Sequence, residues 1–317
     1  MANSKHIPTL EEFRAASEMI RSVAMRTPLI PLRWYDEDPK ILLKPEIFQP
    51  IGSYKIRGVY NWAMHLEPEE RAKGISTVSA GNMAIAVAYI GKLLGIPARG
   101  IMFDTTPRSK IKAVEKYGAE VVLMSRDEIF DYIEDRPGDR CFLHPLEEYI
   151  LMEGHGTIGL EIIEDAPETD TIYVAIGAGF LGGGTALAAK ALKPSVKVVG
   201  VNSDAYPHFY ESYKRGEPVE VQFKESLADS IAAPVTRDHM LRLLQDILDD
   251  VVLVSEDMIK ESIRYLATEN KMFVEGAAAT SLSAALDEDQ GIRGNTVCIL
   301  SGGSIDPEKV ADILKHL

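Results

Sequence analysis

The sequence predicts an α/β protein whose sheets are parallel and carry helices on both faces. Two observations lead to this fold class. Apolar, β-branched segments recur along the chain, and a stretch with helical periodicity lies beside each of them. Strands that are apolar throughout are buried on both faces, which is typical of parallel sheets covered by helices. The predicted strands are residues 74–80, 98–103, 119–124, 171–176, 196–201, 250–254 and 296–300.

The helices between these strands have recognisable ends. The helix predicted over residues 82–95 should stop at Gly95, and the helix over 106–118 should stop at Gly118, because glycine favours the left-handed conformation that ends helices. A further helix begins within residues 154–163 and leads into the next strand. This pattern predicts a small domain of residues 74–148, inserted in a large domain of residues 1–73 and 149–317.

Composition narrows the class of partner. The chain has 317 residues, 46% of them hydrophobic and 26% charged, and a formal net charge of −14. Such an acidic chain is a poor binder of nucleic acid or of anionic membranes. Its two cysteines lie far apart in sequence, and neither a leader peptide nor a long apolar run is apparent. We expect a cytoplasmic protein that acts on a small molecule and binds no metal.

Residues 174–184, VAIGAGFLGGG, take a buried strand through glycines into an alanine-rich helix. Such a turn suits a phosphate, because free backbone N–H groups and the positive end of the helix dipole face it. The spacing of Gly177, Gly179 and Gly182 also matches the dinucleotide fingerprint, with Asp204 at a fitting distance downstream. These glycines alone leave both a dinucleotide and another phosphate ligand open.

Three further segments carry candidate chemistry. Lys55, in QPIGSYKIRG, is either a solvated charge or a lysine that forms a Schiff base. Ser79 and Asn82, in SAGN, either cap a helix or belong to a turn that binds a carboxylate. Ser301, in CILSGGSID, stands at the carboxyl end of a strand, where ligands of parallel sheets collect. Together with the glycines, these groups suit pyridoxal phosphate and an amino acid.

With these segments in view, the chain resembles the fold-type II pyridoxal-phosphate family, in its serine/threonine dehydratase and serine racemase branch. The resemblance covers nearly the whole chain and implies a two-domain, tryptophan synthase β-like fold. It rests on five motifs in the family's order, and five ordered motifs are far more specific than any one of them. These are SYKIRG at 53–58, SAGN at 79–82, GAGF at 177–180, VEGAAA at 274–279 and SGG at 301–303.

The resemblance implies a role for each motif. Lys55 would form the Schiff base with the cofactor and act as the base, and Lys55 and Ser79 are the expected catalytic residues. Ser301 would face the pyridine nitrogen. The implied cofactor contacts are Lys55, Asn82, Gly177, Ala178, Gly179, Phe180 and Ser301. The implied substrate contacts are Ser53, Ser79, Ala80, Gly81, Asn82 and Met83.

The reaction implied is β-elimination from L-threonine or L-serine, which yields a 2-oxo acid and ammonia. Racemases of this branch place a second serine in the SAGN loop, where this chain has Ala80. The family's cation site uses a glutamate where this chain has Asn202, which is why no metal is expected. The alternatives are a β-hydroxyaspartate or phenylserine dehydratase, a serine racemase, a β-replacement enzyme, an NAD-dependent oxidoreductase and a non-catalytic binding protein. The resemblance also implies a homodimer.

Overall fold

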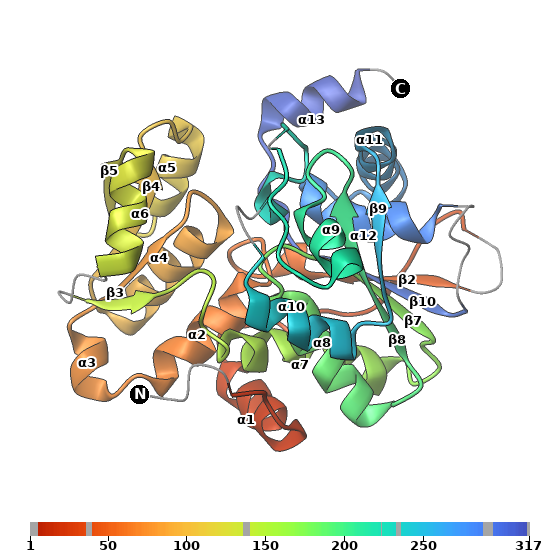
Figure 1. The fold of residues 1–317 in the computed structure, drawn as a ribbon, viewed down its shortest axis with the longest axis horizontal. Coiled ribbons are helices and arrows are strands. Elements are labelled where there is room, and N and C mark those ends of the chain that lie inside the picture. Colours follow the sequence, from red (N-terminus) through yellow and green to blue (C-terminus); the bar gives the residue numbers. More distant parts are fainter. Residues whose placement is uncertain are drawn as a thin grey trace.

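The computed structural model describes residues 6–35, 40–135, 140–222, 224–232, 236–287 and 294–315. It contains two sheets, each packed between helices (Figure 1). In spatial order the larger sheet consists of β1 (Ile30–Pro31), β2 (Ile41–Pro45), β10 (Thr296–Leu300), β7 (Thr171–Ala175), β8 (Lys197–Ser203) and β9 (Asp250–Val254). The smaller sheet consists of β5 (Glu120–Met124), β4 (Ala98–Phe103), β3 (Ile75–Val78) and β6 (Cys141–Leu143).

All paired strands run parallel except β1, which is antiparallel to β2. The expected α/β fold with parallel sheets is therefore confirmed. The α-helices are α1 (Leu10–Ile20), α2 (Lys55–His65), α3 (Pro68–Ala72), α4 (Asn82–Leu94), α5 (Arg108–Glu115), α6 (Arg126–Asp135), α7 (Leu151–Asp165), α8 (Phe180–Leu192), α9 (His208–Arg215), α10 (Asp238–Ile247), α11 (Glu256–Tyr265), α12 (Gly276–Ala285) and α13 (Pro307–Leu314). Short turns η1 (Glu46–Phe48), η2 (Asp229–Ile231) and η3 (Leu266–Asn270) connect some of them.

Each strand predicted from the sequence is present, and three more are found: β1, β2 and β6. The first has two residues and β6 has three, which is too short for a pattern. The strand β2 escaped prediction because its fourth position holds Lys44, a charge that argues against a buried strand. Gly95 and Gly118 both have positive φ, as expected for the residues that end α4 and follow α5.

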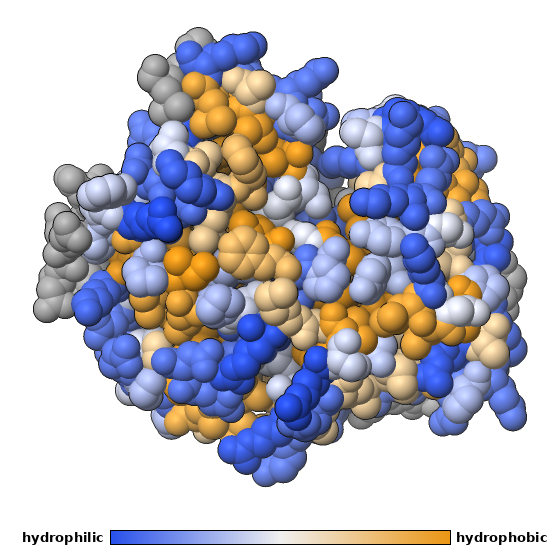
Figure 2. All heavy atoms as spheres, turned by 180° about the vertical axis from the view of Figure 1, so that it is seen from behind, coloured by the Kyte–Doolittle hydropathy of each residue, from blue (hydrophilic) through white to orange (hydrophobic). Residues whose placement is uncertain are grey.

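The smaller sheet and its helices form one lobe, at the left of Figure 1, and the larger sheet lies in the other lobe. Seen from behind, the two lobes are parted by a notch at the upper edge (Figure 2). Every strand of the smaller sheet falls between residues 75 and 143. This agrees with an inserted unit of residues 74–148, and the division into domains stays a prediction. Among the described residues, no helix has the length and apolar character to cross a membrane.

Beneath the start of α2 lies a buried cluster of charges. The Arg57 guanidinium binds Glu46 through Nε (2.8 Å) and Glu161 through Nη1 (2.6 Å), and Lys44 binds Glu161 at 2.6 Å. All four side chains are almost completely buried. Burial alone would lower the pKa of Arg57, but the two carboxylates outweigh it and raise that pKa. Two cations and two anions thus neutralise one another and hold α2, η1, β2 and α7 together.

Replacing Arg57 with methionine should lower the free energy of unfolding by about 3–5 kcal/mol, because Glu46 and Glu161 would lose their shared buried partner. Urea denaturation checks this value. The control is Arg26→Ala, which removes half-exposed ion pairs to Glu164 and Asp165 and should cost less than about 1 kcal/mol. Equal losses for the two variants would contradict a special role for the buried cluster.

Candidate active site

Lys55 is the first residue of α2, and its segment is fixed to the end of β10. The Tyr54 N–H donates to the Ser301 carbonyl (3.0 Å), and the Gly303 N–H donates to the Gly52 carbonyl (2.9 Å). Ser53 and Gly302 form an antiparallel bridge between these two contacts. Backbone hydrogen bonds therefore bring Lys55 and Ser301 side by side, although about 250 residues separate them in sequence.

Three adjacent strands deliver the predicted groups to one edge of the larger sheet. Strand β10 lies between β2 and β7. The chain leaving β2 leads through η1 to Lys55, β10 ends just before Ser301, and β7 ends just before the glycine turn (residues 177–180). Because these strands are parallel, their carboxyl ends meet at the same edge, which is where ligands of such sheets bind.

The turn of residues 79–81 leads from β3 into α4. The N-cap of α4 is Gly81, and no side chain caps the helix; the Ser79 hydroxyl instead accepts the Gly81 N–H at 3.1 Å. The interpretation of Ser79 and Asn82 as helix caps is therefore wrong. The first N–H groups of α4 have no intrahelical partner and remain available to an anion such as a carboxylate.

The side chain of Asn82 reaches across to α12. Its amide Nδ2 donates to the two carboxylate oxygens of Glu275, at 3.0 and 3.1 Å. Glu275 is the N-cap residue of α12 but makes no capping bond. The Glu275 N–H donates to the Gly302 carbonyl (3.0 Å), so this pair lies directly beside the end of β10.

Glu275 is a functional candidate that the sequence indicated only weakly, as one letter of the VEGAAA motif. It is almost fully buried, and burial raises its pKa to about 7, although the hydrogen bond from Asn82 favours the charged form. A buried carboxyl group with a pKa near neutrality can gain or lose a proton under physiological conditions. Its partner lies 193 residues away in sequence, so no local pattern could have found the pair.

The glycine turn starts α8. Gly179 is the N-cap residue with φ +100°, and no side chain caps the helix, so its first N–H groups face the open end. Ile176 is the last residue before this turn. The glycines at 182 and 200 accommodate it, because a Cβ at either position would lie within 2.7 Å of the Ile176 side chain.

The short turn η2 joins these parts. A Cβ at Gly177 would lie 3.1 Å from Cα of Ile231, and Ser230 hydrogen-bonds the Glu275 side chain. Asp229, in the same turn, forms an ion pair with Lys110 of α5 at 3.1 Å, which links the two lobes. The structure thus brings Lys55, Asn82, Ser301 and the glycine turn around one region.

Among the described residues, the buried Oδ1 of Asn82 and Oγ of Ser53 lack a hydrogen-bond partner. A Cβ on Gly302 would come within 2.7 Å of the Glu275 carboxylate, so there is no room for a side chain between Gly302 and Glu275. A Cβ on Gly81 would meet no atom within 4 Å, so the turn of residues 79–81 faces open space at this position. Unpartnered buried polar atoms, an anion-binding helix start and a lysine fit a phosphorylated aldehyde cofactor.

The remaining expected contacts lie along the same turn. Met83 is buried at the start of α4, whereas Ser79, Ala80 and Gly81 are partly exposed. Residues 79–83 therefore form one turn that continues into the first residues of α4. Their roles toward a substrate stay predictions.

The family is decided by comparison with known proteins. The pyridoxal-phosphate dependent enzyme family matches residues 20–302 of this sequence. The chain belongs to this family. Its cofactor is pyridoxal phosphate, and the dinucleotide interpretation of the glycine turn is set aside. The match contains four of the five motifs in full and the first two residues of the fifth, Ser301 and Gly302.

Among curated relatives, the L-threonine ammonia-lyase of Thermotoga maritima is 37% identical over 314 residues, which is 96% of this chain and 78% of the relative. The catabolic L-threonine dehydratase of Staphylococcus aureus is 33% identical and covers 98% and 93% of the two chains. Among solved structures, maize serine racemase superposes with a TM-score of 0.88 at 29% identity, covering 98% of both chains. The T.th. threonine deaminase gives a TM-score of 0.85 at 31% identity, covering 94% and 99%.

Asn202, at the position where the resemblance places a cation ligand, has another task here. Its Nδ2 donates to the Ile176 carbonyl (2.6 Å), and its Oδ1 accepts the Tyr210 N–H (2.9 Å). It therefore ties the strand end before the glycine turn to α9. Within the described ranges, no three His, Cys, Asp or Glu side chains are grouped as metal ligands.

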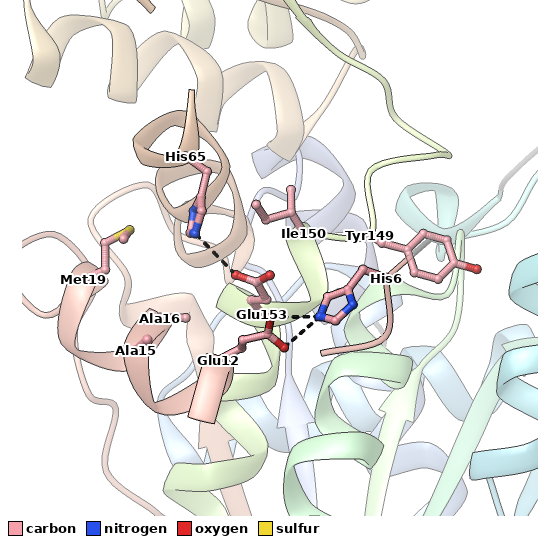
Figure 3. A pocket seen from close by; sticks show the side chains of 9 residues that line it. All are labelled: His6, Glu12, Ala15, Ala16, Met19, His65, Tyr149, Ile150 and Glu153. Atoms are coloured by element: carbon pink, nitrogen blue, oxygen red, sulfur yellow. Dashed lines mark hydrogen bonds and ion pairs between the residues drawn. The ribbon is translucent and has the colours of Figure 1, made fainter. Parts of the chain in front are cut away.

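A separate pocket of about 360 Å³ lies beside α1 and the first turn of α7. In Figure 3, His6 points to Glu12 (2.8 Å) and His65 points to Glu153 (3.9 Å) across this pocket. None of the predicted site residues lines it. We therefore assign the chemistry to the region around Lys55 and not to this pocket.

The raised pKa of Glu275 makes stability depend on pH. The folded protein holds the Glu275 proton more tightly than the unfolded chain does, so this stabilisation is complete below pH 4.5 and is lost as pH rises through about 7. Glu275→Gln stays uncharged, so without added cofactor it should exceed the wild type by about 1–3 kcal/mol at pH 8 and match it near pH 4.5. Thermal unfolding at both pH values measures the difference.

Glu261→Gln, on the exposed side of α11, is the matched control and should show the same difference from wild type at both pH values. A Glu275→Gln variant whose difference from wild type does not change with pH would contradict the raised pKa.

Proposed function

We propose that this protein is a pyridoxal-phosphate dependent ammonia-lyase that removes the β-hydroxyl and the amine from L-threonine or L-serine. The products are a 2-oxo acid and ammonium. The observation that carries the proposal is the meeting of Lys55, Asn82, Ser301 and the glycine turn at one sheet edge. The curated relatives named L-threonine ammonia-lyase and L-threonine dehydratase support this choice of reaction.

Different residues of the site bind the cofactor and accept the proton. The N–H groups of residues 177–180 and the dipole of α8 hold the phosphate, and Asn82, whose Oδ1 lacks a partner, meets the ring. Pyridoxal phosphate supplies, when bound, the conjugated electron-withdrawing system that acidifies the Cα–H of an amino acid. Lys55 takes that proton, and its Nζ already lies over the Tyr54 ring, 4.7 Å from the centroid.

Two substrate contacts follow from the turn at α4. The substrate carboxylate binds the free N–H groups at the start of α4, with Ser79 beside them. Ser301 would face the pyridine nitrogen, where a hydroxyl, unlike a carboxylate, would not stabilise a positive charge on the ring. A hydroxyl at this position would therefore favour prompt loss of the β-substituent.

Ala80 decides between elimination and racemisation. Racemisation needs a proton donor on the face opposite Lys55, and a methyl group transfers no proton. Structures titled serine racemase are similar to this chain, so the fold itself permits either reaction. The alanine favours the lyase. A larger or acidic β-hydroxy amino acid remains the alternative substrate, since Met83 shapes the entrance.

An absorption spectrum and a substrate panel test the proposal together. The wild type should show a visible band that borohydride removes, and Lys55→Ala should lack both the band and turnover, because no other amine replaces Nζ. L-Threonine and L-serine should yield 2-oxo acid and ammonium much faster than they racemise. The panel also contains β-hydroxyaspartate and phenylserine.

Met64→Ala, on the same helix but away from Lys55, serves as a control and should keep the band. A wild type that binds the cofactor yet turns over none of these amino acids would instead identify a binding protein. Racemisation as fast as deamination would overturn the role given to Ala80.

We also propose a cytoplasmic homodimer. Figure 2 shows apolar side chains gathered across the middle of one face, and an exposed apolar patch is typical of a contact surface between subunits. Light scattering should give about twice the chain mass of 34.9 kDa. A mass equal to one chain at micromolar concentration would refute the dimer.

A further inference from the structure

His155 lies in the first turns of α7 and is completely buried. In the part of the chain that the structure describes, neither of its ring nitrogens has a hydrogen-bond partner. A neutral imidazole has one N–H donor and one acceptor nitrogen, so both are left unsatisfied here. Buried polar groups without partners are rare, and each calls for an explanation.

The imidazole enters the space between α2 and α8. Its neighbours in sequence are two glycines that face opposite helices: a Cβ at Gly154 would lie 2.4 Å from the Arg57 carbonyl of α2, and one at Gly156 would lie 2.7 Å from the Gly184 carbonyl of α8. Successive residues of a helix are about 100° apart, so His155 points between these two directions. The helix α2 starts at Lys55, and α8 starts at the glycine turn.

Gly58 makes room for the ring. A Cβ there would lie 2.4 Å from Nε2 of His155, so only glycine lets the imidazole lie against α2. Tyr54 contacts the ring edge at a centroid distance of 4.7 Å, and Lys55 Nζ is 4.7 Å from the centroid of the same tyrosine. His155 is thus one side chain removed from the Schiff-base lysine.

The surroundings keep His155 uncharged. Burial lowers its pKa well below the usual value, and the positive charges of Lys55 and Arg57 lower it further. The ring therefore cannot serve as an ion-pair partner in the buried cluster. A leucine of similar volume would pack there without an unsatisfied polar atom, so folding alone does not account for a histidine.

We propose that His155 is a cofactor-positioning residue, whose uncharged imidazole donates a hydrogen bond to pyridoxal phosphate held between Lys55 and the glycine turn. The inference rests on the family cofactor and on the site of the proposed function, but not on the choice of substrate. It predicts two opposite effects of the histidine: a lower stability of the cofactor-free protein and a higher affinity for the cofactor.

The test compares His155→Leu and His155→Gln with the wild type in two measurements, the melting temperature of the cofactor-free protein and the Kd for pyridoxal phosphate from absorbance titration. His155→Leu should melt about 2 °C or more above wild type, because an unsatisfied polar group is gone. Its Kd should rise about tenfold or more, because a hydrogen bond to a charged group is lost. His155→Gln keeps a donor and should stay within about threefold of the wild-type Kd.

Thr185→Val is the matched control. Thr185 on α8 is also fully buried with an unpartnered hydroxyl, but it lies beyond the first turn of that helix. Its replacement should leave the Kd unchanged. Titration with pyridoxal, which lacks the phosphate, locates the bond: an unchanged Kd for pyridoxal in His155→Leu assigns it to the phosphate, and an equal loss assigns it to the ring.

A His155→Leu variant that binds pyridoxal phosphate as tightly as the wild type overturns the proposal, whatever its melting temperature. A lower melting temperature together with weaker binding also overturns it, because the histidine is then a packing residue. Neither readout involves an amino acid. A wild type that binds the cofactor but deaminates nothing would therefore refute the proposed function and leave the role of His155 standing.

Discussion

The Arg57 guanidinium is the contact on which the rest of the site depends. It lies two residues after Lys55 and binds carboxylates from two other segments, Glu46 before α2 and Glu161 at the far end of α7. Such a cluster gains little over apolar packing in net stability, because removing four charges from water is costly. What it fixes is direction. Arg57 can satisfy both carboxylates only when α2 has one rotation about its axis, and that rotation sets where Lys55 points.

Glycines let three helices approach closely enough for this arrangement. Side chains at Gly58, Gly154, Gly156 or Gly184 would collide with a neighbouring backbone or ring. The helices α2, α7 and α8 therefore pack backbone to backbone, and the starts of α2 and α8 open toward the same sheet edge. The site is consequently built from helix ends and strand ends, whose unpaired backbone groups suit anions, with few charged side chains.

The local features of the site could be predicted from the sequence. Buried strands, Lys55 at a helix start, the glycine turn and Ser301 at a strand end each depend on neighbours within about ten residues, so pattern reveals them. Contacts between residues far apart in the sequence could not be predicted. The charge of Lys44 argued against a buried strand at β2. This charge is neutralised by Glu161, which lies 117 residues away, so no local pattern could reveal it. The Asn82–Glu275 pair and the unsatisfied ring of His155 likewise depend on which segments meet in the fold.

The ion pair between Lys110 and Asp229 is a weak link between the two lobes. It joins the two lobes next to Glu275, yet its side chains are 38% and 47% exposed. Exposed pairs are worth about 1 kcal/mol or less, which is close to thermal energy. Such an exposed ion pair breaks and re-forms readily, and it weakens as ionic strength rises. The contact between the two lobes beside Glu275 therefore contributes little to stability, and this contribution decreases further at high ionic strength.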